Sequence, residues 1–217
     1  MSTPLSVKNQ LQYCINGINQ YTNKNAKTLT EAVEKLYGVE RLGYIETTGT
    51  QYIDTLYTPN NNTMIETKFV LKTANSGLYA SDSNGSLNTN CTAYISSKVT
   101  GGSFRFGNKS VIVRVEQNKI AKTLQSKDGV YLNDTLVSSY TNISTFTSTQ
   151  TLKLGFNANK FVGEIFYQKI WDDGVLVRYL IPAKDSNNVV CFFDLVEYKF
   201  YYNAGTGDFV AGYEELE

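Results

Sequence analysis

Carboxylates are the side chains with which this chain could perform chemistry, because its 217 residues include no histidine. Histidine is the usual general base and a common metal ligand, so its absence removes the most frequent routes to acid–base catalysis. Two carboxylates alone can hydrolyse a glycosidic bond when they lie roughly 5 to 9.5 Å apart. Such a pair requires acids at alternate positions of one strand, or on facing strands.

Glu164 is the one acid in the strand-like segment that leads to Asp172. Its alternate neighbours on that segment are Val162 and Phe166, which carry no charge. Asp172 and Asp173 follow in a predicted turn, where carboxylates serve turn formation. The sequence therefore predicts no enzymatic activity and no catalytic residue, with a glycoside hydrolase kept as an alternative.

Loop acids offer another kind of binding chemistry. Calcium is bound by carboxylate and carbonyl oxygens, and Asp82, Asp128 and Asp208 lie in predicted loops. None of them has the spacing of a helix–loop–helix calcium site. The three cysteines are far apart and form no Cys-x-x-Cys pair, so neither zinc nor a disulfide framework is expected. We therefore expect no metal site and no cofactor, with a structural calcium ion as the alternative.

The composition is that of a globular chain with balanced charge. Hydrophobic residues make up 41% and charged residues 18%, as in folded proteins. Twenty basic and twenty acidic residues cancel, so neither nucleic acid nor an anionic membrane surface is an expected partner. No apolar run reaches transmembrane length. No signal-peptide pattern opens the chain, and we expect export by another route, such as a lysis-released particle.

From residue 40 onwards the sequence has the pattern of antiparallel strands. Residues 65–71 alternate apolar and polar side chains, which is typical of a strand with one buried face. Two tight hairpin turns are predicted, at Asn133-Asp134 and at Asp172-Asp173-Gly174, where glycine can adopt a positive φ. Roughly a dozen short strands separated by turns predict an all-β, two-sheet sandwich.

Four blocks carry a resemblance to a known fold family: LGYIETTGTQYIDT at 42–55, LKLGF at 152–156, GEIFYQKIWDDGVLVRYLIPA at 163–183 and VVCFFDLVEYKFYYNAGTGDF at 189–209. They resemble the concanavalin A-like, LamG-type jelly-roll modules of phage and gut-bacterial surface proteins. The resemblance implies a two-sheet antiparallel jelly roll that serves as a ligand-binding or structural module and not as an enzyme. The NAGTG run within the last block lies between strands with no helix after it, so it is not a predicted phosphate loop.

Aromatic residues are the candidates for sugar binding. The chain contains sixteen tyrosines and one tryptophan, and sugars stack on aromatic faces. Tyr52, Tyr57, Tyr79 and Tyr94 would suit glycan binding if they are exposed. Tyrosine is also an ordinary strand residue, so packing within the sandwich is the alternative role.

Residues 1–39 form a separate helical segment in this interpretation. A first helix has apolar positions spaced by four and three residues, and a second begins at a capping box of Thr28 and Glu31 and ends at Gly38. The expected assembly surface consists of Val7, Leu11, Cys14, Ile18, Tyr21, Leu29, Val33 and Leu36. Helices this short need a partner. That partner is either the chain's own β domain or another protein.

The run TLTEAVEKLYG at 28–38 resembles N-terminal segments of phage head-fibre and tail-associated proteins. We interpret the chain as a non-enzymatic bacteriophage virion protein: a head fibre, capsid decoration or tail adhesin, assembled in the host cytoplasm. Residues 1–39 would bind other virion proteins, and the jelly roll of residues 40–217 would contact a host-surface glycan. A homo-oligomer is expected, with a trimer favoured over a dimer. The alternative is a bacterial surface or secreted glycan-binding, lectin-like protein.

Overall fold

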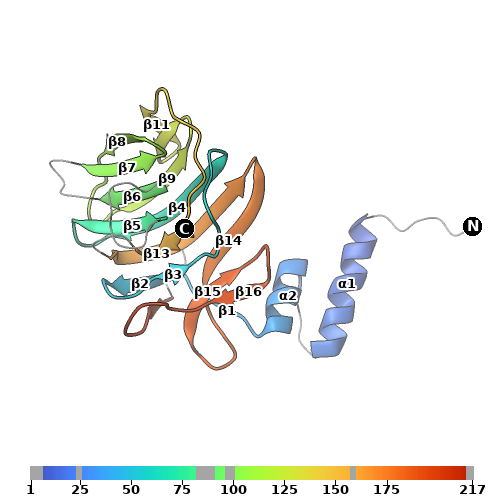
Figure 1. Cartoon of the computed structure of the whole chain (residues 1–217). Helices are drawn as coiled ribbons and strands as arrows, with labels where there is room; N and C mark the ends of the chain where they lie inside the picture. Colours follow the sequence, from blue (N-terminus) through green and yellow to red (C-terminus); the bar gives the residue numbers. More distant parts are fainter. Residues whose placement is uncertain (1–6, 23–25, 82–90, 96–100, 157–159, 214–217) are drawn as a thin grey trace, which may run out of the picture.

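Two antiparallel sheets pack face to face, and two helices stand at one side of them (Figure 1). The computed structural model describes residues 7–22, 26–81, 91–95, 101–156 and 160–213, and in the first helix it describes the side chains of residues 12 and 14–20. The predicted all-β, two-sheet antiparallel sandwich is confirmed.

The larger sheet has eleven strands in the described residues and is built around one long central strand, β13. The main path runs in the order β11-β10-β9-β4-β13-β14-β15-β16, β2 also pairs with β13, β17 pairs with β2, and β1 pairs with β14. The strands are β1 (Glu40–Arg41), β2 (Tyr44–Thr48), β4 (Thr63–Leu71), β9 (Ile120–Ser126), β10 (Gly129–Leu132), β11 (Thr135–Ser139), β13 (Val162–Asp172), β14 (Val175–Lys184), β15 (Val190–Asp194), β16 (Lys199–Tyr201) and β17 (Val210–Gly212).

The smaller sheet has six strands in the described residues, in the order β3-β12-β5-β6-β7-β8. They are β3 (Ile53–Asp54), β5 (Ser76–Ala80), β6 (Cys91–Ile95), β7 (Gly102–Phe106), β8 (Lys109–Val113) and β12 (Lys153–Leu154).

Both predicted hairpins are present, and their turns share one geometry. Asp172 pairs with Val175 across the β13–β14 turn, where Asp173 and Gly174 have φ of 48° and 78°. Asn133 and Asp134 in the β10–β11 turn have φ of 48° and 66°. Positive φ at both central residues defines a type I′ turn, which matches the twist of the flanking strands. Asp134 therefore adopts the conformation that glycine usually supplies.

A hydrophobic core lies between the sheets and contains one buried polar link. Phe69 of β4 and Phe161 pack edge to face with ring centroids 5.8 Å apart, and both rings are fully buried. Gln125 of β9 is also fully buried, and its side chain accepts a hydrogen bond of 2.7 Å from the Tyr79 hydroxyl on β5. The two sheets are thus joined by a directed contact as well as by apolar packing.

The two predicted helices are present as α1 (Val7–Thr22) and α2 (Leu29–Tyr37). The Thr28 hydroxyl accepts a hydrogen bond of 3.1 Å from the Glu31 amide, and Gly38 ends α2 with a φ of 71°. These are the N-cap and C-cap that the sequence predicts. Neither helix is long and apolar enough to cross a membrane, within the residues that the structure describes.

Helix α1 packs against α2 through a face that includes the predicted Ile18 and Leu29 but uses Ile15 in place of Cys14. Ile15, Ala26 and Ala32 are buried in this contact, and Ile18 and Leu29 pack beside them. Cys14 is exposed, because Ile15, the larger apolar neighbour, turns toward α2 instead. Val33 is half-buried and Leu36 is exposed. The side chains of Val7, Leu11 and Tyr21 lie outside the described residues, and the assembly role of the whole set stays a prediction.

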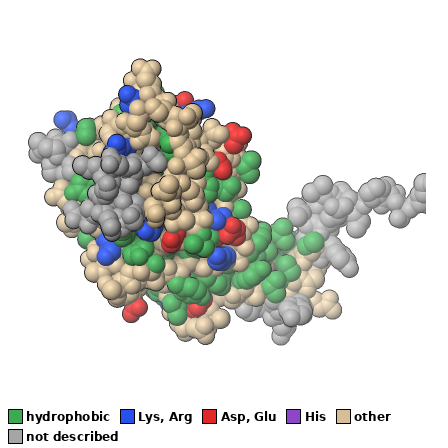
Figure 2. Space-filling model, in the orientation of Figure 1, with side chains coloured by type: hydrophobic (Ala, Val, Ile, Leu, Met, Phe, Trp, Pro, Cys, Tyr) green, Lys and Arg blue, Asp and Glu red, His purple; other side chains and the backbone are tan. Residues whose placement is uncertain are grey.

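The C-terminal end of α2 packs against the larger sheet through the Tyr37 ring. The Tyr37 ring lies 6.0 Å from Phe193 of β15 and stacks at 6.1 Å on Tyr198 in the β15–β16 turn. Figure 2 shows hydrophobic side chains gathered where the helices meet the sandwich. Figure 1 places α1 on the far side of α2 from the sheets. Of the two predicted partners of the helices, the chain's own β domain is contacted by α2, whereas α1 contacts α2.

Candidate functional site

A groove of about 510 Å³ opens between the β14–β15 connection and the chain that follows β16. Its volume is within the range of small-molecule sites, roughly 300 to 1,000 Å³. It is lined by Asn188, Val189, Val190, Tyr202, Asn203, Gly205, Gly207, Asp208 and Phe209. We call it the Tyr202 groove.

The glycine-rich loop that forms one wall is held in shape by Asn203. The Asn203 side-chain oxygen accepts hydrogen bonds from the amides of Tyr52 (3.1 Å) and Gly205 (2.8 Å). Its side-chain nitrogen donates to the Gly207 carbonyl at 2.7 Å. One asparagine thus ties the loop to itself and to the segment before β3, so this wall is preformed.

The amides of this loop are used by the protein itself. Ala204 donates to the Tyr52 carbonyl at 2.8 Å, and Thr206 donates to the Thr50 carbonyl at 3.1 Å. With the Gly205 amide also bonded, three successive donors do not point at a ligand. A phosphate loop needs free amides and the start of a helix. The loop is therefore a rigid wall and not an anion cradle, in agreement with the sequence analysis.

Tyr202 supplies an aromatic surface within the groove. The residue is 48% exposed, and its ring stacks on Phe200 with centroids 6.1 Å apart. Its hydroxyl donates a 3.0 Å hydrogen bond to the Asp185 carboxylate. Partial burial of the hydroxyl, together with that carboxylate, raises the pKa of Tyr202 to about 12. The ring is consequently an oriented, neutral phenol at physiological pH.

Asp185 fixes the opposite wall of the groove. Its carboxylate accepts hydrogen bonds from the amides of Val189 (2.9 Å) and Asn187 (2.8 Å). These amides and the Tyr202 hydroxyl hold the pKa of the carboxyl below its usual range. Asp185 therefore stays ionised and organises the β14–β15 connection.

Two polar side chains in the groove have no partner within the described part of the chain. Asn188 and Asp208 are exposed, and their side chains form no hydrogen bond or ion pair with described residues. An amide can donate and accept, whereas a carboxylate accepts only. With the Tyr202 ring and the apolar side chains of Val189 and Phe209, they form a surface that is apolar with a few polar groups. Such a surface suits a hydroxyl-bearing ligand with an apolar face.

The predicted glycan-contact tyrosines differ in exposure, and none of the four is among the described residues that line the Tyr202 groove. Tyr79 is fully buried and bonded to Gln125, so its predicted exposure is wrong: the strand β5 is covered on both faces. Tyr57 is half-buried, with its hydroxyl 2.8 Å from Thr63. Tyr94 on β6 and Tyr52 are also half-buried. Tyr52 comes nearest to the groove, since its backbone supports the glycine-rich loop.

A carboxylate pair on facing strands was missed by the sequence analysis. Glu46 on β2 is the direct cross-strand neighbour of Glu164 on β13. The Lys72 ammonium lies 2.9 Å from a Glu46 oxygen and 3.0 Å from a Glu164 oxygen. Its pKa is raised, chiefly by the hydrogen bond to Glu46. Both acids are thus bound by one ammonium group, which holds the pair in an ion-pair network on the sheet.

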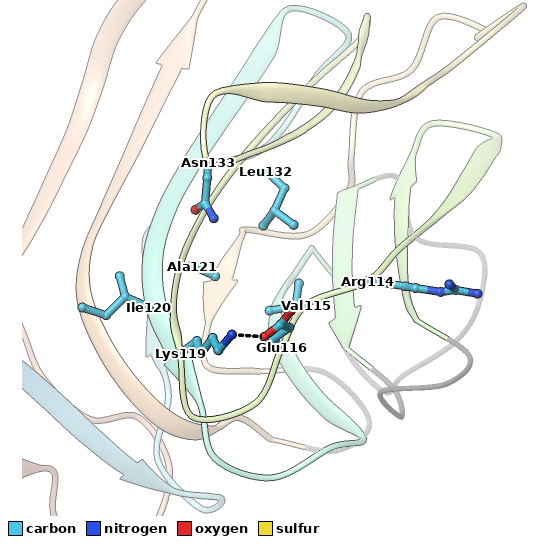
Figure 3. A pocket seen from close by; sticks show the side chains of 8 residues that line it. All are labelled: Arg114, Val115, Glu116, Lys119, Ile120, Ala121, Leu132 and Asn133. Carbon is cyan, nitrogen blue, oxygen red and sulfur yellow. Dashed lines mark ion pairs between the residues drawn. The ribbon is translucent and has the colours of Figure 1, made fainter.

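A second groove of about 280 Å³ lies beside the β8–β9 connection and is lined by the eight residues labelled in Figure 3. Val115 and Ala121 are buried apolar residues there. Lys119 and Glu116 form an ion pair of 2.5 Å with each other, and Arg114 points away from the space (Figure 3). Its charged groups are thus paired or turned outward, so this groove offers a ligand fewer free polar groups than the Tyr202 groove does.

The described residues contain no group of three or more histidine, cysteine, aspartate or glutamate side chains arranged to hold a metal ion. Cys91 and Cys191 are free, buried thiols, and burial raises the pKa of Cys191 to about 12. Neither has the thiolate character of a reactive cysteine.

Comparison with known proteins supports the fold class. No family model matches the chain, and no curated protein matches it. The chain is similar to the crystal structure of a Bacteroides ovatus ATCC 8483 protein for which carbohydrate binding has been proposed, with a TM-score of 0.58, 11% identity, and coverage of 80% of this chain and 61% of that chain. A native heptameric SAP-like pentraxin from Limulus polyphemus gives a TM-score of 0.47 and 12% identity, with coverage of 82% and 95%.

The likeness to the Bacteroides structure supports a two-sheet antiparallel jelly-roll fold for this chain. This chain spans 61% of the length of that protein. At 11% identity the similarity is one of fold, and function has to be argued from the site.

Proposed function

We propose that this chain is a non-catalytic, lectin-like module that binds carbohydrate in the Tyr202 groove. The observation that carries the proposal is an exposed, oriented Tyr202 ring in one preformed groove with Asn188 and Asp208, whose side chains have no partner among the described residues. A sugar ring can stack on the aromatic face while its hydroxyls bond to the amide and the carboxylate. The fold of the Bacteroides protein is consistent with this role.

Glycan-array binding of four purified proteins tests the proposal. Tyr202→Ala removes the aromatic surface, so this variant should lose the glycan binding that the wild type shows. Tyr202→Phe keeps the ring and should retain most of it. Tyr213→Ala is the matched control, because Tyr213 is 61% exposed but does not line the groove. Glycan binding that survives Tyr202→Ala unchanged would contradict the proposal.

We also propose, as a second candidate, that the helices attach the module to a larger assembly. The support is that α1 packs on α2 at the side away from the sheets (Figure 1) and that residues 28–38 resemble phage fibre segments. In this candidate the assembly is a bacteriophage virion formed in the host cytoplasm, with the module as a head fibre, capsid decoration or tail adhesin. A bacterial surface or secreted lectin is the competing setting.

Two truncations separate attachment from folding. Deleting residues 1–27 removes α1 but keeps Tyr37 on Phe193, so the sandwich should stay folded while particle incorporation and any trimer are lost. Deleting residues 1–38 should also lower stability, because Phe193 loses its cover. Light scattering and co-sedimentation with particles are the readouts. If the chain that lacks residues 1–27 enters particles at the same level as the wild type, the attachment role is contradicted.

A further inference from the structure

The Tyr202 groove carries an uneven charge. Among the described residues that line it, Asp208 is the one carboxylic acid, and none is a lysine or an arginine. The carboxylate of Asp208 has no ion-pair partner among the described residues. A ligand in the groove therefore meets an uncompensated negative charge.

A second carboxylate lies just behind the lining. Asp185 receives the Tyr202 hydroxyl and the Val189 amide, and these bonds come from two residues that line the groove. They keep Asp185 ionised, but they bring no positive charge to balance it. Its field thus has the same sign as that of Asp208.

The nearest basic residue on the neighbouring strand is already engaged. Lys184 of β14 is the cross-strand neighbour of Val190, which lines the groove. The Lys184 ammonium pairs with Glu40 at 3.5 Å and also contacts the Tyr213 hydroxyl. Because its charge is already paired with the Glu40 carboxylate on β1, Lys184 offsets the two groove carboxylates only weakly.

From this arrangement we infer that the Tyr202 groove selects uncharged glycans and rejects anionic ones, such as uronic-acid or sulfated sugars. The inference rests on the proposed function. A neutral sugar hydroxyl can donate to Asp208 and can donate to or accept from Asn188. A sugar carboxylate or sulfate has no proton to donate and meets charges of its own sign. The selection therefore works partly by repulsion, which is a common basis of specificity.

Isothermal titration with matched hexasaccharides tests the inference. The probes are a neutral hexamer (maltohexaose or the N-acetylglucosamine hexamer) and an anionic hexamer (oligogalacturonate). Wild type should bind a neutral hexamer at least about tenfold more tightly than the anionic one. Asp208→Asn should lower the ratio of the neutral-hexamer affinity to the anionic-hexamer affinity. Asp208→Lys should make the anionic hexamer the tighter ligand. Glu116→Lys, in the second groove, is the matched control and should leave the ratio unchanged.

The two possible failures are distinguishable. If oligogalacturonate binds as tightly as the neutral hexamers, and Tyr202→Ala abolishes that binding, charge selection is wrong while carbohydrate binding in the groove stands. If binding of every probe is unaffected by Tyr202→Ala, or if neither these hexamers nor the glycan array yields binding, the proposed function is wrong and the inference falls with it.

Discussion

Gln125 of the larger sheet and Tyr79 of the smaller sheet are joined by a 2.7 Å hydrogen bond across the core. The same Gln125 amide donates to the Tyr140 hydroxyl at 2.7 Å and to the Arg105 carbonyl at 2.9 Å. Burial raises the pKa of both tyrosines well above the usual value, so both hydroxyls stay neutral. A single side chain therefore satisfies polar groups from three segments of the fold.

Gln125→Leu should lower the free energy of unfolding by about 2 to 4 kcal/mol, because buried donors and acceptors lose their partner. Tyr79→Phe removes one bond and should lower it by about 1 kcal/mol. Urea denaturation gives both values. Gln150→Leu is the control, since Gln150 is exposed, and its effect should stay within about 0.5 kcal/mol. An unchanged urea midpoint for Gln125→Leu would show that the link is dispensable.

Gly205→Ala should displace the glycine-rich loop. A Cβ at this position would lie 2.1 Å from the Thr50 carbonyl oxygen, which is backbone and cannot move aside cheaply. We expect a loss of about 1 to 3 kcal/mol in unfolding free energy and weaker sugar binding, because Asn203 and Asp208 shift with the loop. Ala204→Ser, at an exposed neighbour, should leave both quantities unchanged. Wild-type sugar affinity in Gly205→Ala would mean that the loop wall does not shape the site.

Asp185→Asn should remove part of the acid sensitivity of the fold. The pKa of Asp185 is lowered in the folded state, chiefly by the Val189 amide. A lowered folded pKa contributes stability above the unfolded value, near 4, and that stability is lost as pH falls through the folded pKa. Wild type should therefore exceed the variant in stability at neutral pH, and the difference should shrink below about pH 4. Urea midpoints across pH give the curve. A gap that persists at low pH would rule out this carboxylate as its source.

Lys72→Met should leave Glu46 and Glu164 facing each other without a counter-charge. Like charges at directly paired strand positions repel, so we expect a loss of about 1 kcal/mol at neutral pH that recovers when the acids are protonated. Lys119→Met removes a more exposed ion pair and should have a smaller effect.

The same residues test the proposal that the chain is not an enzyme. Wild type and Glu164→Gln should both show no hydrolysis of β-glucans or capsule polysaccharide, as measured by reducing-end release. Turnover in wild type that Glu164→Gln abolishes would assign catalysis to the cross-strand pair.

Local patterns in the sequence determine the strands, turns and helix ends. The alternation in residues 65–71 and the Asp173-Gly174 turn predict β4 and the β13–β14 hairpin, because period and turn chemistry are properties of adjacent residues. Thr28 and Gly38 likewise predict the ends of α2. The same local reasoning selected Cys14 for the helix contact, although Ile15 occupies it. Adjacent residues of a helix face different directions around its axis, and only the packing partner decides which of the two is buried.

Side-chain groupings between distant segments were decided by the tertiary structure. Tyr79 is one of sixteen tyrosines, and nothing near it in the chain reveals that Gln125 will bury its hydroxyl. Glu46 and Glu164 become neighbours only because β2 pairs with β13. Tyr202, Asn188 and Asp208 line one groove because the Tyr202 hydroxyl bonds to Asp185 on the other side, while Asn203 holds the glycine-rich loop in shape. Strand register and loop docking are set by the energy of the whole core, which no short window of sequence contains.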